Sequence, residues 1–134
     1  MSNLQVSEMN HCKLEEMFRL RLSFMNMMKK TIPNSYPDFP VDITQKASQQ
    51  VCRDLALKGV EEMFEALQHL KNWKPHRVTN IEEDLNRDEF LEEIVDAFNY
   101  FFAMLIVTGF DEKELFQAYL KKDDKIRKRL LSGY

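Results

Sequence analysis

The sequence predicts an all-α fold, a bundle of about four to five helices that occupies residues 1–134 as a single domain. Apolar residues recur with helical spacing over long segments, and no segment shows the alternation of a half-buried strand. The chain contains only three glycines, which leaves little material for tight hairpins. We therefore expect helices and no sheet.

The first expected helix runs from about Ser7 to Lys30 and has a broad apolar side. Its main stripe consists of Leu14, Met17, Phe18, Phe24, Met25 and Met28, and further apolar residues outside the stripe are Leu20, Leu22 and Met27. Six of the eight methionines lie at or before Met28. Methionine suits adaptable core packing, and it equally suits contact with a partner, most simply a second copy of this chain.

Prolines mark the loop that follows. Residues 31–42 cannot be helical throughout, because they contain Pro33, Pro37 and Pro40. Asp42 or Thr44 is then expected to cap a long helix that reaches about Leu70.

A second connector covers residues 71–86. Asn86 or Asp88 is expected to open the next helix, and Gly109 is expected to end it. Asp111 is expected to cap a further helix over residues 112–122, and a last short helix is expected over residues 125–131.

Charge and hydropathy exclude several classes of protein. The net charge of −3 argues against a nucleic-acid partner. The apolar run at residues 100–107 is too short to cross a bilayer, and the first residues lack the layout of a signal peptide. Cys12 and Cys52 are isolated and lack metal-site spacing, which fits a reducing compartment. We therefore expect a cytoplasmic protein with no nucleic-acid or membrane partner.

Two acidic pairs, Glu62/Glu65 and Glu93/Asp96, are the strongest chemical signal in the chain. Residues three apart on a helix share a face, so two such helices packed side by side would bring four carboxylates together. Oxygen ligands of this kind suit Mg²⁺. Zinc and di-iron sites fit poorly, because clustered Cys and His residues are lacking and a Glu-x-x-His pattern occurs only at residues 8–11.

Helical geometry favours a clustered arrangement of these acids over an ordinary solvated surface. Glu62 falls within about 60° of an apolar stripe on its own helix. That stripe is Val51, Leu55, Gly59 and Ala66. Asp96 lies opposite a second apolar face made by Ile94, Phe98, Phe101 and Leu105. Helices that are apolar on two sides belong in a bundle or an oligomer, where unpaired anions are costly unless a cation neutralises them. Gly59 would allow another group to approach closely.

The pattern Glu62-x-x-Glu65 followed by Glu93-x-x-Asp96 resembles the signature of the all-α nucleoside triphosphate pyrophosphohydrolases. This superfamily includes the dimeric dUTPases, the MazG proteins and the dCTP pyrophosphatases. Within it the chain looks most like the dimeric dUTPase-like group, on account of the Trp73-Lys74 step and the tail, whose matching residues are Lys122, Arg129, Gly133 and Tyr134.

Three positions depart from that group. Ile126 stands where the tail pattern has Asn, and Arg21 and Met25 stand on the first helix where Gln and Asn would read the uracil edge. These departures leave the expected chemistry in place and open the choice of base. Arg21 would read a different base or pair with a carboxylate.

The resemblance implies Mg²⁺-dependent hydrolysis of a deoxynucleoside triphosphate to the monophosphate and pyrophosphate by a homodimer. The metal ligands implied are Glu62, Glu65, Glu93 and Asp96, with Glu62 or Glu65 also acting on the attacking water. The phosphate-binding residues implied are Lys74, Lys122 and Arg129. The residues implied to bind base or sugar are Arg21, Trp73, Asn99 and Tyr134.

Three alternatives accompany this leading hypothesis. The same chemistry on dCTP or a purine nucleotide would suit Arg21 and Met25. A non-catalytic helical interaction module would suit the methionine-rich first helix. A nucleic-acid-binding protein would use the basic residues of segment 121–129, but Asp123 and Asp124 interrupt that run.

Overall fold

The computed structural model describes residues 12–71, 73–76 and 85–133. Over these ranges it contains no strand and four helices, α2 (Lys13–Thr31), α3 (Lys46–Leu67), α5 (Arg87–Val107) and α6 (Glu112–Ser132). The predicted all-α fold is thus confirmed. No helix in the described part of the chain is both long enough and apolar enough to cross a membrane.

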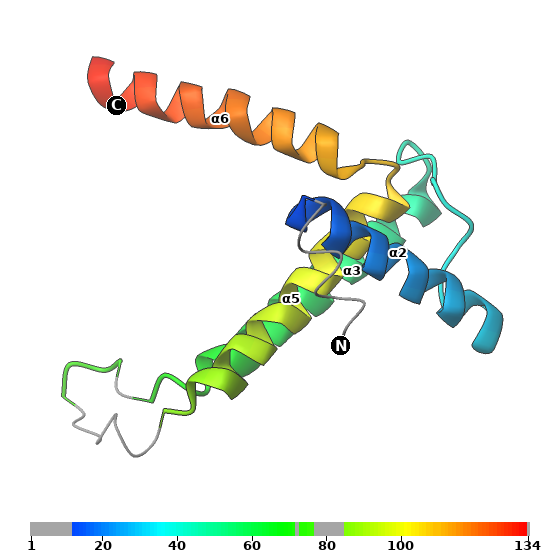
Figure 1. Cartoon of the computed structure of the whole chain (residues 1–134), viewed down its shortest axis with the longest axis horizontal. Helices are drawn as coiled ribbons and strands as arrows, with labels where there is room; N and C mark the ends of the chain where they lie inside the picture. Colours follow the sequence, from blue (N-terminus) through cyan, green and yellow to red (C-terminus); the bar gives the residue numbers. More distant parts are fainter. Residues whose placement is uncertain (1–11, 72, 77–84, 134) are drawn as a thin grey trace.

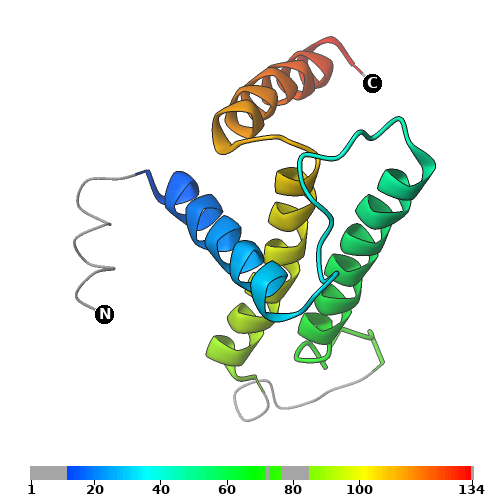
Figure 2. The same cartoon turned by 90° about the vertical axis from the view of Figure 1, so that its right-hand side faces the viewer.

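Helices α3 and α5 run antiparallel and form the most extensive contact in the chain, while α2 crosses α5 (Figures 1 and 2). The buried core lies where these three helices meet and consists of Met25, Leu55, Ala103 and Val107. Side chains from the α2–α3 loop, including Tyr36 and Phe39, pack against this core. Helix α6 leaves the end of α5 and extends away from the bundle in both views.

Gly59 is a point of close approach between α3 and α5. A Cβ atom added at this position would lie 2.7 Å from Cε1 of Phe101. The sequence predicts a close approach at Gly59, and the structure identifies the approaching group as the Phe101 ring. The missing side chain lets α5 pack directly on the backbone of α3.

Helix starts confirm some predicted caps and correct another. Asn86 and Asp111 cap α5 and α6, since their side-chain oxygens accept hydrogen bonds from backbone N–H groups in the first turns. Neither Asp42 nor Thr44 caps α3, whose N-cap residue is Gln45. Asp42 instead accepts hydrogen bonds from the backbone N–H and the hydroxyl of Thr44, so its side chain closes a local turn before the helix.

Other boundaries shift by a few residues. Helix α3 ends at Leu67, three residues before the expected Leu70. Helix α5 ends at Val107 with Thr108 as its C-cap, and Gly109 ends it as expected, since its φ is 90°. The expected start of the first helix at Ser7 lies outside the described residues.

The two expected C-terminal helices are one continuous helix, so the prediction of a break near residue 123 was wrong. Ion pairs with i, i+4 spacing span that point, from Asp123 to Arg127 at 2.7 Å and from Asp124 to Lys128 at 2.8 Å. Such pairs support a helix through a charged segment. None of the residues in α6 is buried.

Apolar side chains on the outer sides of α3 and α5 remain exposed in the single chain. Val60, Phe64 and Leu67 on the outer side of α3 are exposed, as are Phe98 and Val95 on α5. The expectation that both sides of these helices would be covered is therefore met on one side only.

Replacing Gly59 with Ala should destabilise the protein by about 1 kcal/mol, because crowding against Phe101 outweighs the gain in helix propensity. Chemical denaturation monitored by circular dichroism measures this change. Adding Phe101→Leu to Gly59→Ala should relieve the crowding and recover part of the loss. An increase in stability for Gly59→Ala alone would contradict the close contact.

Candidate metal site

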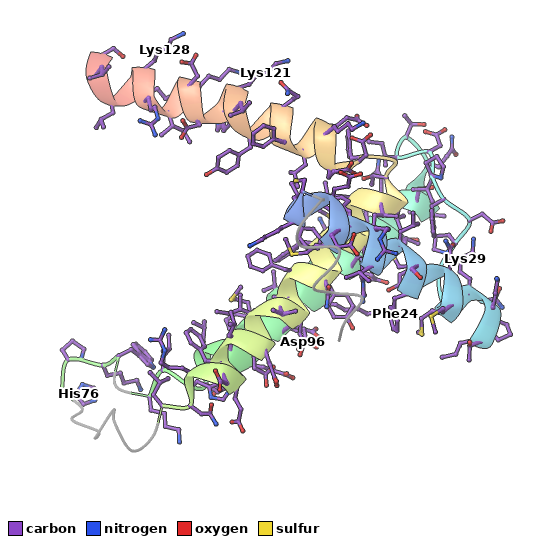
Figure 3. All side chains as sticks on the ribbon, viewed as in Figure 1. Phe24, Lys29, His76, Asp96, Lys121 and Lys128 are labelled. Carbon is purple, nitrogen blue, oxygen red and sulfur yellow. The ribbon has the colours of Figure 1, made fainter. Side chains whose placement is uncertain are left out.

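The antiparallel contact of α3 with α5 brings three of the four predicted acidic ligands together. One carboxylate oxygen each from Glu62, Glu93 and Asp96 lies within 4.8 Å of the other two. Glu62 and Glu93 are half-buried, and Asp96 is exposed at the edge (Asp96 is labelled in Figure 3). The group therefore sits at the rim of the helix pair and is reachable from solvent.

Glu65 joins the same group. Its carboxyl lies close enough to those of Glu62 and Glu93 to raise the pKa of both. All four predicted acids thus gather at one place, although Glu65 itself is exposed. Carboxylates this close together repel one another, and this repulsion makes four negative charges difficult to place side by side.

The crowding of the acids changes their acidity. Burial raises the pKa of the Glu62 carboxyl, and the charge and hydrogen bond of Glu65 raise it further, followed by the charges of Asp96 and Glu93. Burial and then Glu65 also raise the pKa of Glu93, with a further contribution from Asp96, while His69 lowers it. Both shifts mean that the cluster holds protons, or another cation, more readily than isolated carboxylates do.

The geometry fits a hard divalent cation. With bonds about 2.1 Å long, two oxygens on one Mg²⁺ lie about 3.0 Å apart when adjacent and about 4.2 Å apart when opposite. Oxygens within 4.8 Å of one another would move together, by side-chain rotation, to reach these spacings. None of the ion pairs within the described residues involves these four carboxylates, so a bound cation would not have to displace a Lys or Arg.

The predicted phosphate-binding residues lie farther away. Lys122 and Arg129 are exposed on α6, which extends from the end of α5 opposite to the acidic cluster (Figures 1 and 2). Lys74 follows the end of α3, where its Nζ atom lies 5.2 Å from the centre of the Trp73 ring. Trp73 is 70% exposed. The structure therefore does not gather Lys122 and Arg129 with the acids of the same chain.

The remaining predicted residues have mixed positions. Asn99 is half-buried on α5, three residues after Asp96, so the two share a face. Arg21 donates a hydrogen bond to the Tyr36 hydroxyl at 3.3 Å, and its guanidinium lies over the ring of Tyr100. Tyr134 lies outside the described residues.

Sequence reasoning missed two groups beside the cluster. His69 lies close enough to Glu93 to affect its pKa. Lys58, which precedes Glu62 by four residues on α3, lines a pocket of about 430 Å³. The sequence could have predicted that both residues share a helix face with the acids, because Lys58 precedes Glu62 by four residues and His69 follows Glu65 by four residues.

Comparison of the chain with protein-family models, with curated proteins and with solved structures gave no match.

Neutralising Glu62 should stabilise the metal-free protein at neutral pH. Because folding raises the pKa of Glu62, protonation of this carboxyl stabilises the folded protein at pH values below its pKa in the unfolded chain, about 4.3. This stabilisation is lost as the pH rises through the pKa of Glu62 in the folded protein. Glu62→Gln mimics the protonated form. In a chelating buffer at pH 7 its free energy of unfolding should exceed that of the wild type by a few tenths to about 1 kcal/mol, a modest gain because solvent screens the repulsion.

The pH dependence and a neighbouring variant provide the control. The difference between Glu62→Gln and the wild type should shrink toward zero near pH 4. The exposed neighbour Glu61, replaced by Gln, should give no comparable gain. Denaturant titrations across this pH range measure all three proteins, and equal effects of the two substitutions would contradict a specific cluster.

Proposed function

We propose that this protein is a Mg²⁺-dependent pyrophosphohydrolase of deoxynucleoside triphosphates, which it converts to the monophosphate and pyrophosphate. The observation that supports this proposal best is the convergence of Glu62, Glu65, Glu93 and Asp96 from two antiparallel helices. Four carboxylates at a solvent-accessible rim are well suited to hold a cation that in turn binds phosphate oxygens.

In this proposal the four acids hold the ion, which supplies positive charge to the phosphate oxygens and lowers the pKa of water. Glu62 or Glu65 would orient a water molecule and accept its proton. The water oxygen attacks the α phosphorus, the bond to the α–β bridging oxygen breaks, and pyrophosphate leaves.

Cations of the protein would neutralise the remaining phosphate charge. Lys74 lies beyond the carboxyl end of α3 and would serve this purpose within the chain. We assign Lys122 and Arg129 a role only from α6 of a second chain, because their own helix extends away from the acids.

A non-catalytic interaction module is the second candidate, and the exposed apolar residues of α2, α3 and α6 favour it. A nucleic-acid-binding role is less favoured, since Asp123 and Asp124 pair with Arg127 and Lys128 and so neutralise part of the basic segment. We further propose a cytoplasmic location, because Cys12 and Cys52 are free thiols.

Pyrophosphate release from dUTP, dCTP, dATP and dGTP with Mg²⁺ tests the proposal. Glu62→Gln and Asp96→Asn should each lower kcat/KM by more than about a hundredfold, which exceeds the usual effect of losing an outer-shell group of a metal site. Glu61→Gln should retain activity. Absence of release from every nucleotide would reject the enzyme, and full activity in both site variants would reject the assigned residues.

We also propose that the protein is a homodimer in which α6 contributes to the interface. This helix of 21 residues has no buried residue, yet it carries an apolar stripe that includes Phe116, Leu120, Ile126 and Leu130. Most of the stability of a helix in a protein comes from packing of such a face, so the stripe needs a cover. A second copy is the simplest cover, since the first turn of α6 carries Glu112 and Glu114 and its last turn carries Arg129. Two α6 helices paired antiparallel would match these charges.

Phe116→Asp should convert the dimer to a monomer, because pairing would bury the new carboxylate against apolar side chains. Sedimentation velocity measures the mass. Ala118→Asp places the same charge on the opposite side of α6 and should leave the dimer intact. A monomeric wild type, or a Phe116→Asp variant that stays dimeric, would contradict the proposed interface.

A further inference from the structure

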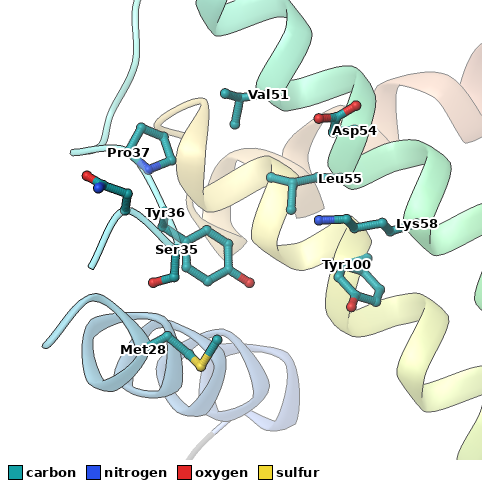
Figure 4. A pocket seen from close by; sticks show the side chains of 10 residues that line it. Met28, Ser35, Tyr36, Pro37, Val51, Asp54, Leu55, Lys58 and Tyr100 are labelled. Carbon is teal, nitrogen blue, oxygen red and sulfur yellow. The ribbon is translucent and has the colours of Figure 1, made fainter. Parts of the chain in front are cut away.

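The pocket that Lys58 lines, one helical turn before Glu62 on α3, has both apolar side chains and polar groups from three parts of the chain. Its volume is about 430 Å³. Apolar side chains from α2 and α3 line one part of it, namely Met28, Val51 and Leu55. Figure 4 shows that Asp54 and Lys58 from α3, Tyr100 from α5, and Ser35 and Tyr36 from the α2–α3 loop surround the same space. A pocket with this mixed lining is suited to bind a ligand that has a flat, partly polar ring.

Two buried polar atoms have no hydrogen-bond partner, one in the pocket lining and one on a residue that contacts the lining. They are the hydroxyl oxygen of Ser35, which lines the pocket, and Nε of Arg21. Arg21 contacts two residues that line the pocket. It donates a hydrogen bond to the Tyr36 hydroxyl, and its guanidinium lies over the Tyr100 ring. Buried polar atoms in native proteins are nearly always paired, so unpaired ones at a pocket wall indicate a place for a polar ligand.

The pocket lies in line with the acidic cluster. Lys58 precedes Glu62 by four residues on α3, and Tyr100 follows Asp96 by four residues on α5. Four residues of helix rise about 6 Å, and residues at this spacing share a face. A ligand with a phosphate end at the acids would therefore extend its other end into the pocket, past Lys58.

The polar groups in the pocket complement a particular pattern on a base. The carboxylate of Asp54 can only accept a hydrogen bond, whereas Lys58 can only donate. Although they are four residues apart, neither takes part in an ion pair within the described residues, so both are open to a ligand. A carboxylate selects an exocyclic amino group, as in its pairing with the amino group of cytosine, and Lys58 or Ser35 suits a ring carbonyl.

We propose that this pocket binds the base of the substrate and selects a base that carries both an amino and an oxo group, which cytosine and guanine share. Asp54 accepts from the amino group, and Lys58 and Ser35 donate to the oxo group. Uracil lacks the amino group and adenine lacks the oxo group. The inference rests on the proposed pyrophosphohydrolase function, and it names the substrates within that function.

The test compares kcat/KM for dCTP, dGTP, dUTP and dATP in the wild type and in Asp54→Asn. The wild type should prefer dCTP or dGTP, and the measured order decides between the two. Asparagine can donate as well as accept, so Asp54→Asn should reduce the preference over dUTP at least tenfold, mainly through KM. Glu61→Gln, a matched loss of charge on the same helix, should keep the wild-type order.

Calorimetric binding of dCMP, dGMP, dUMP and dAMP provides a readout without turnover. Asp54→Asn should lose binding of dCMP or dGMP, whereas Glu61→Gln should retain it. This result supports the base pocket even if no triphosphate is hydrolysed. In that case only the proposed function fails. A wild type that prefers dUTP or dATP overturns the base assignment. An unchanged preference in Asp54→Asn, or no monophosphate binding by an inactive wild type, also overturns it.

Discussion

The contact between α3 and α5 is the constraint on which the candidate site depends. Gly59 lets the Phe101 ring approach the backbone of α3, and this approach fixes the spacing and register of the two helices. One turn farther along α3, the same register places Glu62 opposite Glu93 and Asp96. The acids are therefore brought together by apolar packing that does not involve them. Their mutual repulsion opposes this packing, and a cation at the cluster would relieve it.

The same register also relates the acids to the neighbouring pocket. Successive turns of α3 carry Asp54, Lys58 and Glu62. Asp54 and Lys58 line the partly apolar pocket, whereas Glu62 belongs to the acidic cluster. On α5, Tyr100 likewise lines the pocket, and Asp96, four residues earlier, belongs to the acidic cluster. A nucleotide is likewise flat and partly apolar at one end and needs a metal ion at the other. This correspondence links the proposed chemistry with the proposed base pocket through one structural feature, the antiparallel helix pair.

Much of this arrangement could be predicted from local sequence patterns. The i, i+3 acidic pairs, the capping residues Asn86 and Asp111 and the role of Gly59 follow from helical geometry, which depends on residues close together in the chain. The pocket could not be predicted in this way, since Ser35 and Tyr36 reach it through a loop whose path depends on tertiary packing. The break expected in α6 was wrong because ion pairs between neighbouring turns sustain the helix through its charged segment.

The most direct test of the central claim is anomalous X-ray scattering from crystals grown with Mn²⁺ in place of Mg²⁺. The account predicts a single anomalous site, or a pair of neighbouring sites, bounded by carboxylate oxygens of Glu62, Glu93 and Asp96, with Glu65 turned toward it. An absence of anomalous density at these residues in crystals that contain ordered Mn²⁺ elsewhere, with the four side chains directed into solvent, would contradict the claim that a divalent cation holds this cluster together.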